Sequence, residues 1–314
     1  MSTWWSTPSR PTNAPVSSRA TVPDDQAGAV SVGELWRRTT NDIGDRAAAR
    51  WLCEVATGLS GSEFATALDE PVTEAMVAHL DAMLARRSTG EPLQYVLGQW
   101  SFRHLDLAID RRVLIPRPET EEVAGVAIEL TAAAVEQRGS AVVADLGTGS
   151  GAIGLSVAYE SPLGAVEIWL TDRDPDALDV ARANLAGLGQ RGAGVRLALG
   201  SWFDALPDHE VFDVIVANPP YVADGSAEVE PDVVAWEPAG ALFAGPDGLD
   251  HVRTLAAGVL DRLRPGGWVV IEIGARQGPA VTELLEHHGA VDVAIRRDAA
   301  GLDRIALGRR PDIG

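Results

Sequence analysis

The sequence predicts an α/β protein with a doubly wound, mostly parallel sheet, preceded by a small helical domain. Two observations carry this prediction. From residue 116 onward, short apolar runs of strand length alternate with segments of helix length, the pattern of a parallel sheet with helices on both faces. Between residues 31 and 88, apolar residues recur instead at helical spacing, which indicates a small bundle.

The chain begins with a segment, residues 1–30, that is rich in Ser, Thr, Pro and Ala and lacks periodicity, so we expect a disordered tail. Residues 31–88 follow with three apolar stripes. The stripes comprise Leu35, Thr39 and Ile43; Trp51, Leu52 and Val55; and Met76, Val77, Leu80, Met83 and Leu84. The helical spacing alone is equally consistent with two roles for this domain: one that only packs against the rest of the protein, and one that recognises a substrate.

Residues 89–115 are predicted to be a linker, and the alternation of polar and apolar residues over 99–115 predicts a β-hairpin within it. The larger α/β domain, residues 116–314, is expected to open with a helix near 119–138. Its strands are expected near residues 141–146, 166–171, 195–199, 212–217, 268–273, 291–296 and 303–308. Its other helices are expected near residues 151–160, 174–187, 247–264 and 277–289. Because only Arg297 to Leu302 joins the last two strands, they should form an antiparallel hairpin at one sheet edge.

A glycine-rich turn follows the first strand of the α/β domain, with the sequence Asp-Leu-Gly-Thr-Gly-Ser-Gly over residues 145–151. Glycines let the backbone turn tightly and let a ligand approach where a Cβ would clash. The next strand ends at Asp172, where a carboxylate suits the two hydroxyls of an adenosine ribose. These features favour an adenosine-containing cofactor and leave NAD and S-adenosylmethionine both open.

A second polar segment, Asn218-Pro219-Pro220-Tyr221, follows the apolar strand at 212–217. Two consecutive prolines cannot continue a sheet ladder, so the strand must end at Asn218. The result is a stiff polar corner at the carboxyl end of a strand, where open α/β sheets bind ligands. Its side-chain oxygen and a nearby backbone carbonyl can accept two N–H bonds from a planar amide or amine. Taken alone, the segment is equally consistent with an ordinary strand-ending turn.

Composition and charge narrow the classes of partner. The net charge is −19 and the basic residues form no stripe, so a nucleic-acid substrate is disfavoured. The one cysteine, Cys53, excludes an internal disulfide and a Cys-rich zinc site, and it fits a reducing compartment. Its apolar neighbours indicate a core position. No apolar run reaches transmembrane length, so we expect a cytoplasmic protein that does not enter a membrane.

Several further stretches are distinctive. They are residues 90–98 (GEPLQYVLG), 113–121 (VLIPRPETE), 236–238 (Trp-Glu-Pro), 247–250 (Asp-Gly-Leu-Asp), 265–267 (Pro-Gly-Gly) and 303–309 (DRIALGR). The glycine-rich turn after the first strand and Asn-Pro-Pro-Tyr after the fourth are laid out as in S-adenosylmethionine-dependent amino-methyltransferases. Together with the other stretches, they make residues 31 to 310 resemble the protein-(glutamine-N5) methyltransferases of peptide chain release factors, the HemK/PrmC family.

The resemblance implies the class I methyltransferase fold, with S-adenosylmethionine as methyl donor and S-adenosylhomocysteine as product. It also implies that the partner is a release factor, that the helical domain recognises it, and that the glutamine of its Gly-Gly-Gln motif is methylated, which modulates translation termination. The cofactor-binding residues expected from the motifs are Asp145, Gly147, Thr148, Gly149, Ser150, Gly151, Asp172, Trp202 and Asn218. Relatives often carry an acidic residue before the aromatic ring that packs on adenine, whereas this chain has Ser201 before Trp202.

The expected chemistry needs no metal, because a sulfonium methyl group is already a strong electrophile. The acceptor amide is expected to bind at Asn218, Pro219, Pro220 and Tyr221. Of these, Asn218, Pro219 and Tyr221 are the expected catalytic residues. The Asn218 oxygen and the Pro219 carbonyl would accept both N–H bonds, while the Tyr221 ring packs on the amide plane. Positioning of this kind can supply roughly 7–11 kcal/mol in well-oriented systems.

Three alternatives remain. A sister group methylates glutamine in a ribosomal protein, and the IPRPETE stretch argues against that reading. Adenine-N6 methyltransferases of DNA or RNA share Asn-Pro-Pro-Tyr, and the missing basic stripe argues against them. A scaffold that binds cofactor without turnover is disfavoured because the motif positions are intact.

Overall fold

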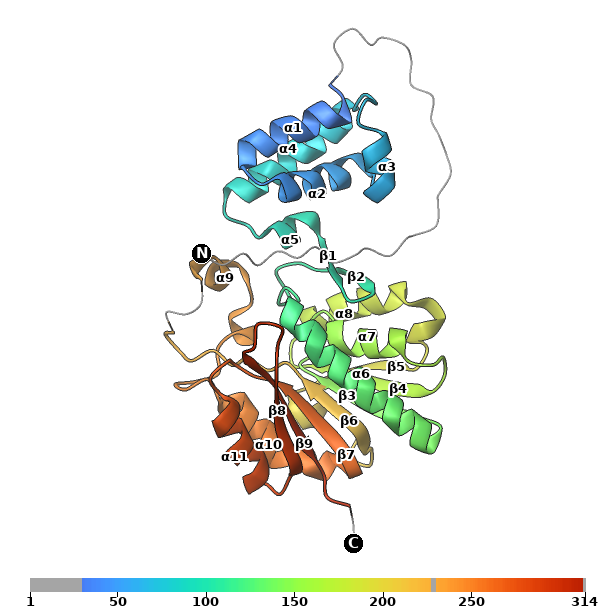
Figure 1. Cartoon of the computed structure of the whole chain (residues 1–314), viewed down its shortest axis with the longest axis vertical. Helices are drawn as coiled ribbons and strands as arrows, with labels where there is room; N and C mark the ends of the chain where they lie inside the picture. Colours follow the sequence, from blue (N-terminus) through green and yellow to red (C-terminus); the bar gives the residue numbers. More distant parts are fainter. Residues whose placement is uncertain (1–29, 227–229, 313–314) are drawn as a thin grey trace. The chain divides into compact units, whose positions relative to one another are not determined.

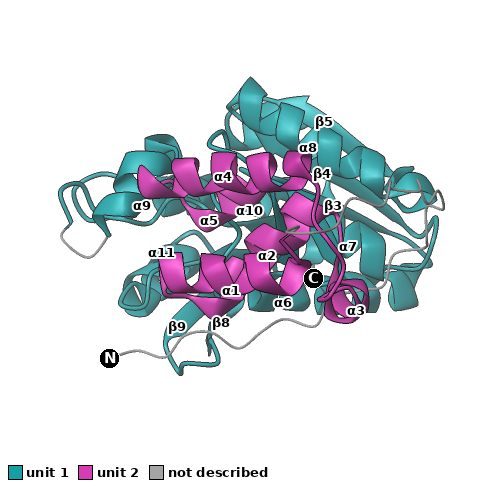
Figure 2. Ribbon diagram, turned by 90° about the horizontal axis from the view of Figure 1, so that it is seen from above, with its two compact units in different colours: residues 1–10, 99–314 teal, residues 11–98 magenta. Residues whose placement is uncertain are grey.

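A computed structural model describes residues 30–226 and 230–312, which separate into two compact units (Figures 1 and 2). The helical unit ends at Gly98, and the unit that contains the large sheet begins at Gln99. Apart from Val30, the predicted disordered tail at residues 1–30 lies outside the described residues. Among the residues that are described, no helix combines the length and apolar character needed to cross a bilayer.

The described part of the helical unit holds five helices around a small apolar core. They are α1 (Val32–Ile43), α2 (Arg46–Thr57), α3 (Gly61–Thr66), α4 (Glu74–Ser88) and α5 (Leu93–Leu97). The side-chain oxygens of Ser31, Asp45 and Thr73 accept backbone N–H groups at the starts of α1, α2 and α4. Cys53 is fully buried beside Phe64 and Leu80, so the sequence-based expectation of a core cysteine is confirmed.

The predicted linker, residues 89–115, is divided between the two units. Helix α5 packs against α2 and α4 in the helical unit, while β1 (Gln99–Phe102) and β2 (Leu105–Ala108) form an antiparallel hairpin. The hairpin is therefore shorter than the alternation predicted, because residues 109–117 leave the ladder. Asn184 fixes β2 to the rest of the larger unit, since its side chain both accepts from Ala108 N (2.7 Å) and donates to Ala108 O (3.0 Å).

The larger unit is built on a seven-stranded sheet whose order is β5-β4-β3-β6-β7-β9-β8. Its strands are β3 (Ala141–Leu146), β4 (Val166–Asp172), β5 (Val195–Leu199), β6 (Phe212–Ala217), β7 (Leu263–Glu272), β8 (Val291–Arg297) and β9 (Asp303–Arg309). The strands from β3 to β7 pair in parallel, and β9 pairs antiparallel with both β7 and β8. The predicted mostly parallel sheet with an antiparallel edge hairpin is confirmed.

Helices cover both faces of this sheet. They are α6 (Pro118–Arg138), α7 (Ala152–Glu160), α8 (Pro175–Gly187), α10 (Asp250–Arg262) and α11 (Gly278–His287). The short helix α9 (Pro231–Trp236) lies in the connection between β6 and α10. One face packs Leu146, Ile215 and Ile271 against α10 and α11, while α6, α7 and α8 pack against the other (Figure 1). Strand β7 begins before the expected 268–273, because Leu263 pairs with Phe212 ahead of a shift in register.

The strand order places the candidate site. Strands β3 and β6 lie side by side, although their connections to the neighbouring strands run in opposite directions along the sheet. Open α/β sheets bind ligands at the carboxyl ends of the strands where the order reverses in this way. The glycine-rich turn follows β3, Asp172 ends β4 and Asn218 follows β6, so these features all lie at one edge of the sheet.

Candidate active site

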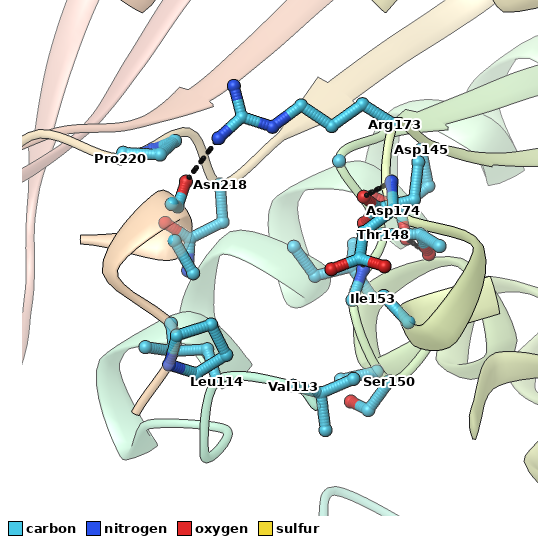
Figure 3. Close-up of a pocket in the computed structure, with 18 of the residues that line it drawn as sticks. Val113, Leu114, Asp145, Thr148, Ser150, Ile153, Arg173, Asp174, Asn218 and Pro220 are labelled. Atoms are coloured by element: carbon cyan, nitrogen blue, oxygen red, sulfur yellow. Dashed lines mark hydrogen bonds between the residues drawn. The ribbon is translucent and has the colours of Figure 1, made fainter. Parts of the chain in front are cut away.

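A pocket lies at the carboxyl ends of β3, β4 and β6, and most of the residues predicted from the sequence line it (Figure 3). The predicted residues that line it are Asp145, Gly147, Thr148, Gly149, Ser150, Asp172, Trp202, Asn218 and Pro220. Three others do not appear in its lining: Gly151 is the N-cap of α7, Pro219 is buried, and the Tyr221 hydroxyl bonds to Glu272.

The Asp145 side chain stabilises the glycine-rich turn through hydrogen bonds. Its Oδ2 accepts the Thr148 hydroxyl (2.6 Å) and the Gly154 N–H (2.9 Å). Burial raises the pKa of Asp145 to about 6, an effect that these two hydrogen bonds oppose. A Cβ on Gly154 would lie 2.2 Å from the Leu170 side chain, so helix and strand can approach this closely only at a glycine.

Asp172 also takes part in the turn. Its two carboxylate oxygens accept the N–H groups of Gly149 (3.0 Å) and Asp174 (3.0 Å). Burial raises the pKa of this carboxyl as well. Each carboxylate oxygen has a second lone pair, so Asp172 can bond to these two N–H groups and still accept a hydroxyl of a ligand in the pocket.

Two aromatic rings line the pocket next to the glycine-rich turn. Trp202 has a positive φ of 47° and its ring lies against Gly147, where an added Cβ would meet it at 3.4 Å. The His251 ring lies 5.5 Å from the Trp202 ring, centroid to centroid, and burial lowers the pKa of His251. Ser201, which stands where relatives often carry an acid, is exposed and lines the pocket.

The Asn-Pro-Pro-Tyr corner rests on two residues to which the sequence analysis gave no role. Asn218 Nδ2 donates to Thr120 Oγ1 at 3.3 Å, and the Thr120 hydroxyl donates to Glu272 Oε2 at 2.7 Å. The Tyr221 hydroxyl donates to the other oxygen of Glu272 at 3.4 Å. Burial and the nearby Glu272 carboxylate raise the pKa of Tyr221, so its hydroxyl stays protonated at neutral pH and does not supply a phenolate base.

A third buried carboxylate, Glu237, links two segments that line the pocket. Glu237 accepts the Ile115 N–H (3.1 Å) and pairs with the Arg117 guanidinium, although more than a hundred residues separate it from both. Arg173 reaches over from the end of β4 to donate to Gly240 O at 3.1 Å. The segments before α6 and after α9 are thereby held together around the pocket.

Comparisons with known proteins match both the helical unit and the larger unit. A model of the PrmC N-terminal domain matches residues 41–98, and a model of the methyltransferase small domain matches residues 125–236. A release factor glutamine methyltransferase from Xylella fastidiosa is 41% identical over 77% of this chain and 85% of its own. One from Burkholderia pseudomallei is 38% identical over 90% of this chain and 96% of its own. The chain belongs to the release factor glutamine methyltransferases.

Family membership confirms the resemblance and the enzyme class predicted from the motifs. The family depends on S-adenosylmethionine, which implies this cofactor here. Among solved structures, the hMettl16 catalytic domain in complex with MAT2A 3'UTR hairpin 6 gives a TM-score of 0.50 at 16% identity, over 77% of this chain and 83% of its own. That likeness shows the class I methyltransferase fold alone.

The sequence analysis did not identify Thr120, Glu237 and Glu272 as contributors to the site. The first two lie within stretches that carry the family resemblance, residues 113–121 and 236–238, but those stretches indicate no partner. Glu272 carried a usable signal, because it is the one charged residue in the apolar run at 268–273, which belongs to the strand next to the one that leads to Asn218.

Proposed function

We propose that the enzyme transfers one methyl group from S-adenosylmethionine to the side-chain N5 of the glutamine in the Gly-Gly-Gln motif of a peptide chain release factor. The glycine-rich turn, Asp172 and Trp202 would hold the cofactor. Asn218 and Pro219 would hold the acceptor amide. Because release factors act in translation, we place the reaction in the cytoplasm.

The observation that carries the proposal is the orientation of the Asn218 side-chain amide. Its nitrogen donates to Thr120, so its oxygen remains free to accept an N–H from a bound ligand. The Pro219 carbonyl can accept the second N–H of the same planar group. Both protons of an amide nitrogen would then be held, and the nitrogen would be aimed at the sulfonium methyl group.

Holding the nitrogen in this way addresses the difficult part of the reaction. An amide nitrogen donates its lone pair into its carbonyl, so it is a weak nucleophile. Two acceptors favour the electron distribution in which positive charge develops on nitrogen, and the fixed corner supplies them without reorganisation. Proton loss would follow methyl transfer and can go to water.

The partner is argued from charge as well as from the family. With a net charge of −19, the chain is poorly suited to a polyanion. Adenine in DNA or RNA also carries a planar amino group, so the pocket alone would accept either acceptor. We assign recognition of the release factor to the helical unit, whose residues 41–98 match the PrmC N-terminal domain.

A panel of acceptors tests this proposal. Enzyme and tritiated S-adenosylmethionine are incubated separately with release factor, with ribosomal proteins and with duplex DNA. We expect label on the release factor and background counts on the other two. Label on DNA with none on the release factor, or label confined to ribosomal proteins, would overturn the proposed substrate. Enzyme without an acceptor sets the background.

A further inference from the structure

The hydrogen bonds behind Asn218 have a defined direction. Glu272 is 0% exposed and Thr120 is 4% exposed, so neither has ready access to water. A threonine hydroxyl has one proton, and at 2.7 Å that proton goes to the Glu272 carboxylate. The Thr120 oxygen can therefore only accept from Asn218. As a result, the Asn218 amide must turn its nitrogen inward.

We propose that Thr120 and Glu272 are positioning residues, which hold the Asn218 amide with its oxygen facing the acceptor nitrogen. This inference rests on the role proposed above for Asn218. If the amide were turned over, its NH₂ group would face the N–H groups of the acceptor, and two donors would oppose each other. The pair thus selects the one orientation of Asn218 that can bind an amide nitrogen.

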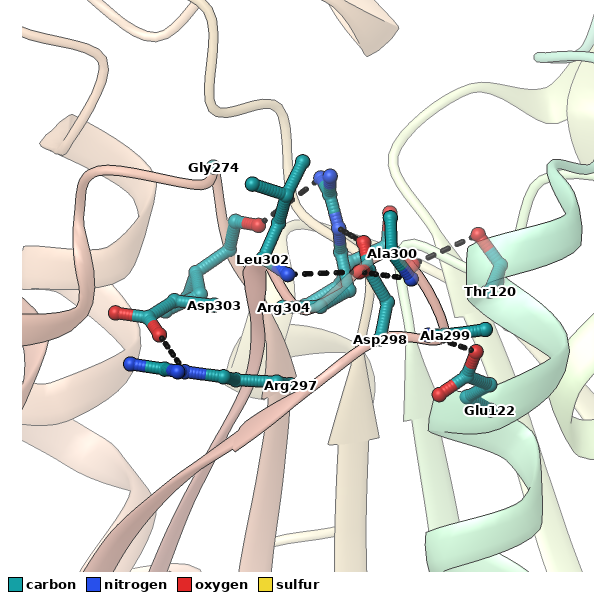
Figure 4. A network of polar contacts seen from close by, with 12 residues as sticks. Thr120, Glu122, Gly274, Arg297, Asp298, Ala299, Ala300, Leu302, Asp303 and Arg304 are labelled. Carbon is teal, nitrogen blue, oxygen red and sulfur yellow. Dashed lines mark hydrogen bonds and ion pairs between the residues drawn. The ribbon is translucent and has the colours of Figure 1, made fainter. Parts of the chain in front are cut away.

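The groups around Glu272 come from three parts of the fold, and Figure 4 shows two of these residues, Thr120 and Arg304. Thr120 and Glu119 belong to α6, Tyr221 follows β6, and Arg304 lies on β9. Arg304 is held in place, because its guanidinium donates to Asp298 Oδ2 (3.3 Å) and to Ile273 O (3.3 Å). The carboxyl therefore has two hydroxyl donors, a nearby cation and a nearby like charge.

These surroundings place the titration of Glu272 near neutrality. Burial raises its pKa to about 7, with a further upward contribution from Glu119, while Thr120, Arg304 and Tyr221 oppose the rise. When ionised, Glu272 takes the proton of Thr120. When protonated, it can donate to Thr120 instead, which frees the Thr120 hydroxyl to donate toward the Asn218 oxygen.

A pH dependence with a defined sign follows. Above pH 7, ionised Glu272 keeps the Asn218 oxygen turned to the acceptor. As the pH falls through about 7, protonation removes this preference, and a growing fraction of the enzyme holds the amide in the wrong orientation. Turnover at saturating substrate should therefore decline on the acid side.

The first test uses matched threonine variants on one helix. Thr120→Val removes the hydroxyl and keeps the shape, so kcat should fall about tenfold, the loss expected for one net hydrogen bond. Calorimetry should show a dissociation constant for S-adenosylmethionine within about twofold of wild type. Thr120→Ser should restore most of the rate. Thr131→Val is the control, because that buried hydroxyl donates to Ala127 O within α6, and its activity should be unchanged.

The second test is the pH profile of kcat on release factor from about pH 5.5 to 8.5. Wild type should lose activity on the acid side with an apparent pKa of about 7. Thr120→Val and Glu272→Gln should both lack this acid limb, that is, the decline of kcat on the acid side of the profile. Asp145 and His251 also line the pocket and are present in every variant, so a limb that they caused would persist.

Two outcomes would overturn the inference: a wild-type kcat in Thr120→Val, or an unchanged acid limb in both variants. Thr120→Val keeps the inference falsifiable should Glu272→Gln fail to fold. If Asn218→Ala were inactive while Thr120→Val were fully active, the positioning role of Thr120 and Glu272 would be wrong, but the proposed role of Asn218 would stand. An active Asn218→Ala would instead remove the proposed role of Asn218 in the reaction.

Discussion

Replacing Asn218 with alanine should abolish turnover and leave the binding of S-adenosylmethionine largely intact. The substitution removes the acceptor that we expect to hold the substrate amide, whereas the glycine-rich turn and Asp172 stay in place. Loss of one preorganised group at a developing charge costs roughly 10²–10³-fold in rate, and here orientation is lost as well. We therefore expect a single-turnover rate at least about 10³-fold below wild type.

Two measurements on the same preparation check this expectation. Rapid-quench single-turnover experiments on release factor give the rate of methyl transfer, and calorimetry gives the dissociation constant of the cofactor. Retained cofactor binding serves as the folding control. A rate close to wild type would remove Asn218 from the mechanism.

Asp172→Ala should weaken cofactor binding more than any other single change at the ribose side of the pocket. A charged acceptor bonded to ligand hydroxyls contributes roughly 1.5–3 kcal/mol, which corresponds to about 10- to 150-fold in the dissociation constant. Asp172 also bonds to the Gly149 N–H, so part of the loss would come from a looser turn. Asp172→Asn should lie between alanine and wild type, since an amide oxygen can still accept.

The control for this prediction is Asp176→Ala, an exposed position in the first turn of α8 that does not line the pocket. Its effect on the dissociation constant should be small. If Asp172→Ala bound the cofactor as tightly as wild type, the ribose would have to lie elsewhere in the pocket.

The strands and the two loop motifs were predictable because their signals are local. An apolar run followed by glycines at 147, 149 and 151, or by Pro219 and Pro220, determines where a strand ends and which backbone geometry follows. Once the strands alternate with helices, the right-handed crossover rule brings the two loops to the same edge of the sheet. The structure confirms that strand pattern.

The contacts behind the corner could not be predicted in the same way. Thr120 and Glu272 are 152 residues apart, and Asn218 lies 98 residues from Thr120. Their meeting depends on the register of β6 against β7 and on the place where α6 begins, which are properties of the folded sheet. Local sequence carries no information about such a pairing.

The segment after the helical domain shows a different limit. The alternation over residues 99–115 predicted a hairpin of that length, whereas the second strand already ends at Ala108. Ile109, Val113 and Ile115 are buried without a strand. Alternating polar and apolar residues indicate an extended segment with one side buried. An irregular segment that packs on a domain shows this pattern as well as a β-strand does.

The most direct test of the proposed function is the identity of the product. Release factor incubated with enzyme and S-adenosylmethionine is digested and sequenced by mass spectrometry. We predict a single added methyl group, about 14 Da, on the side chain of the glutamine in the Gly-Gly-Gln motif, and no addition when that glutamine is replaced by glutamate. Methylation that persists in the glutamate variant, or that appears only on adenine in DNA, would contradict the proposed function.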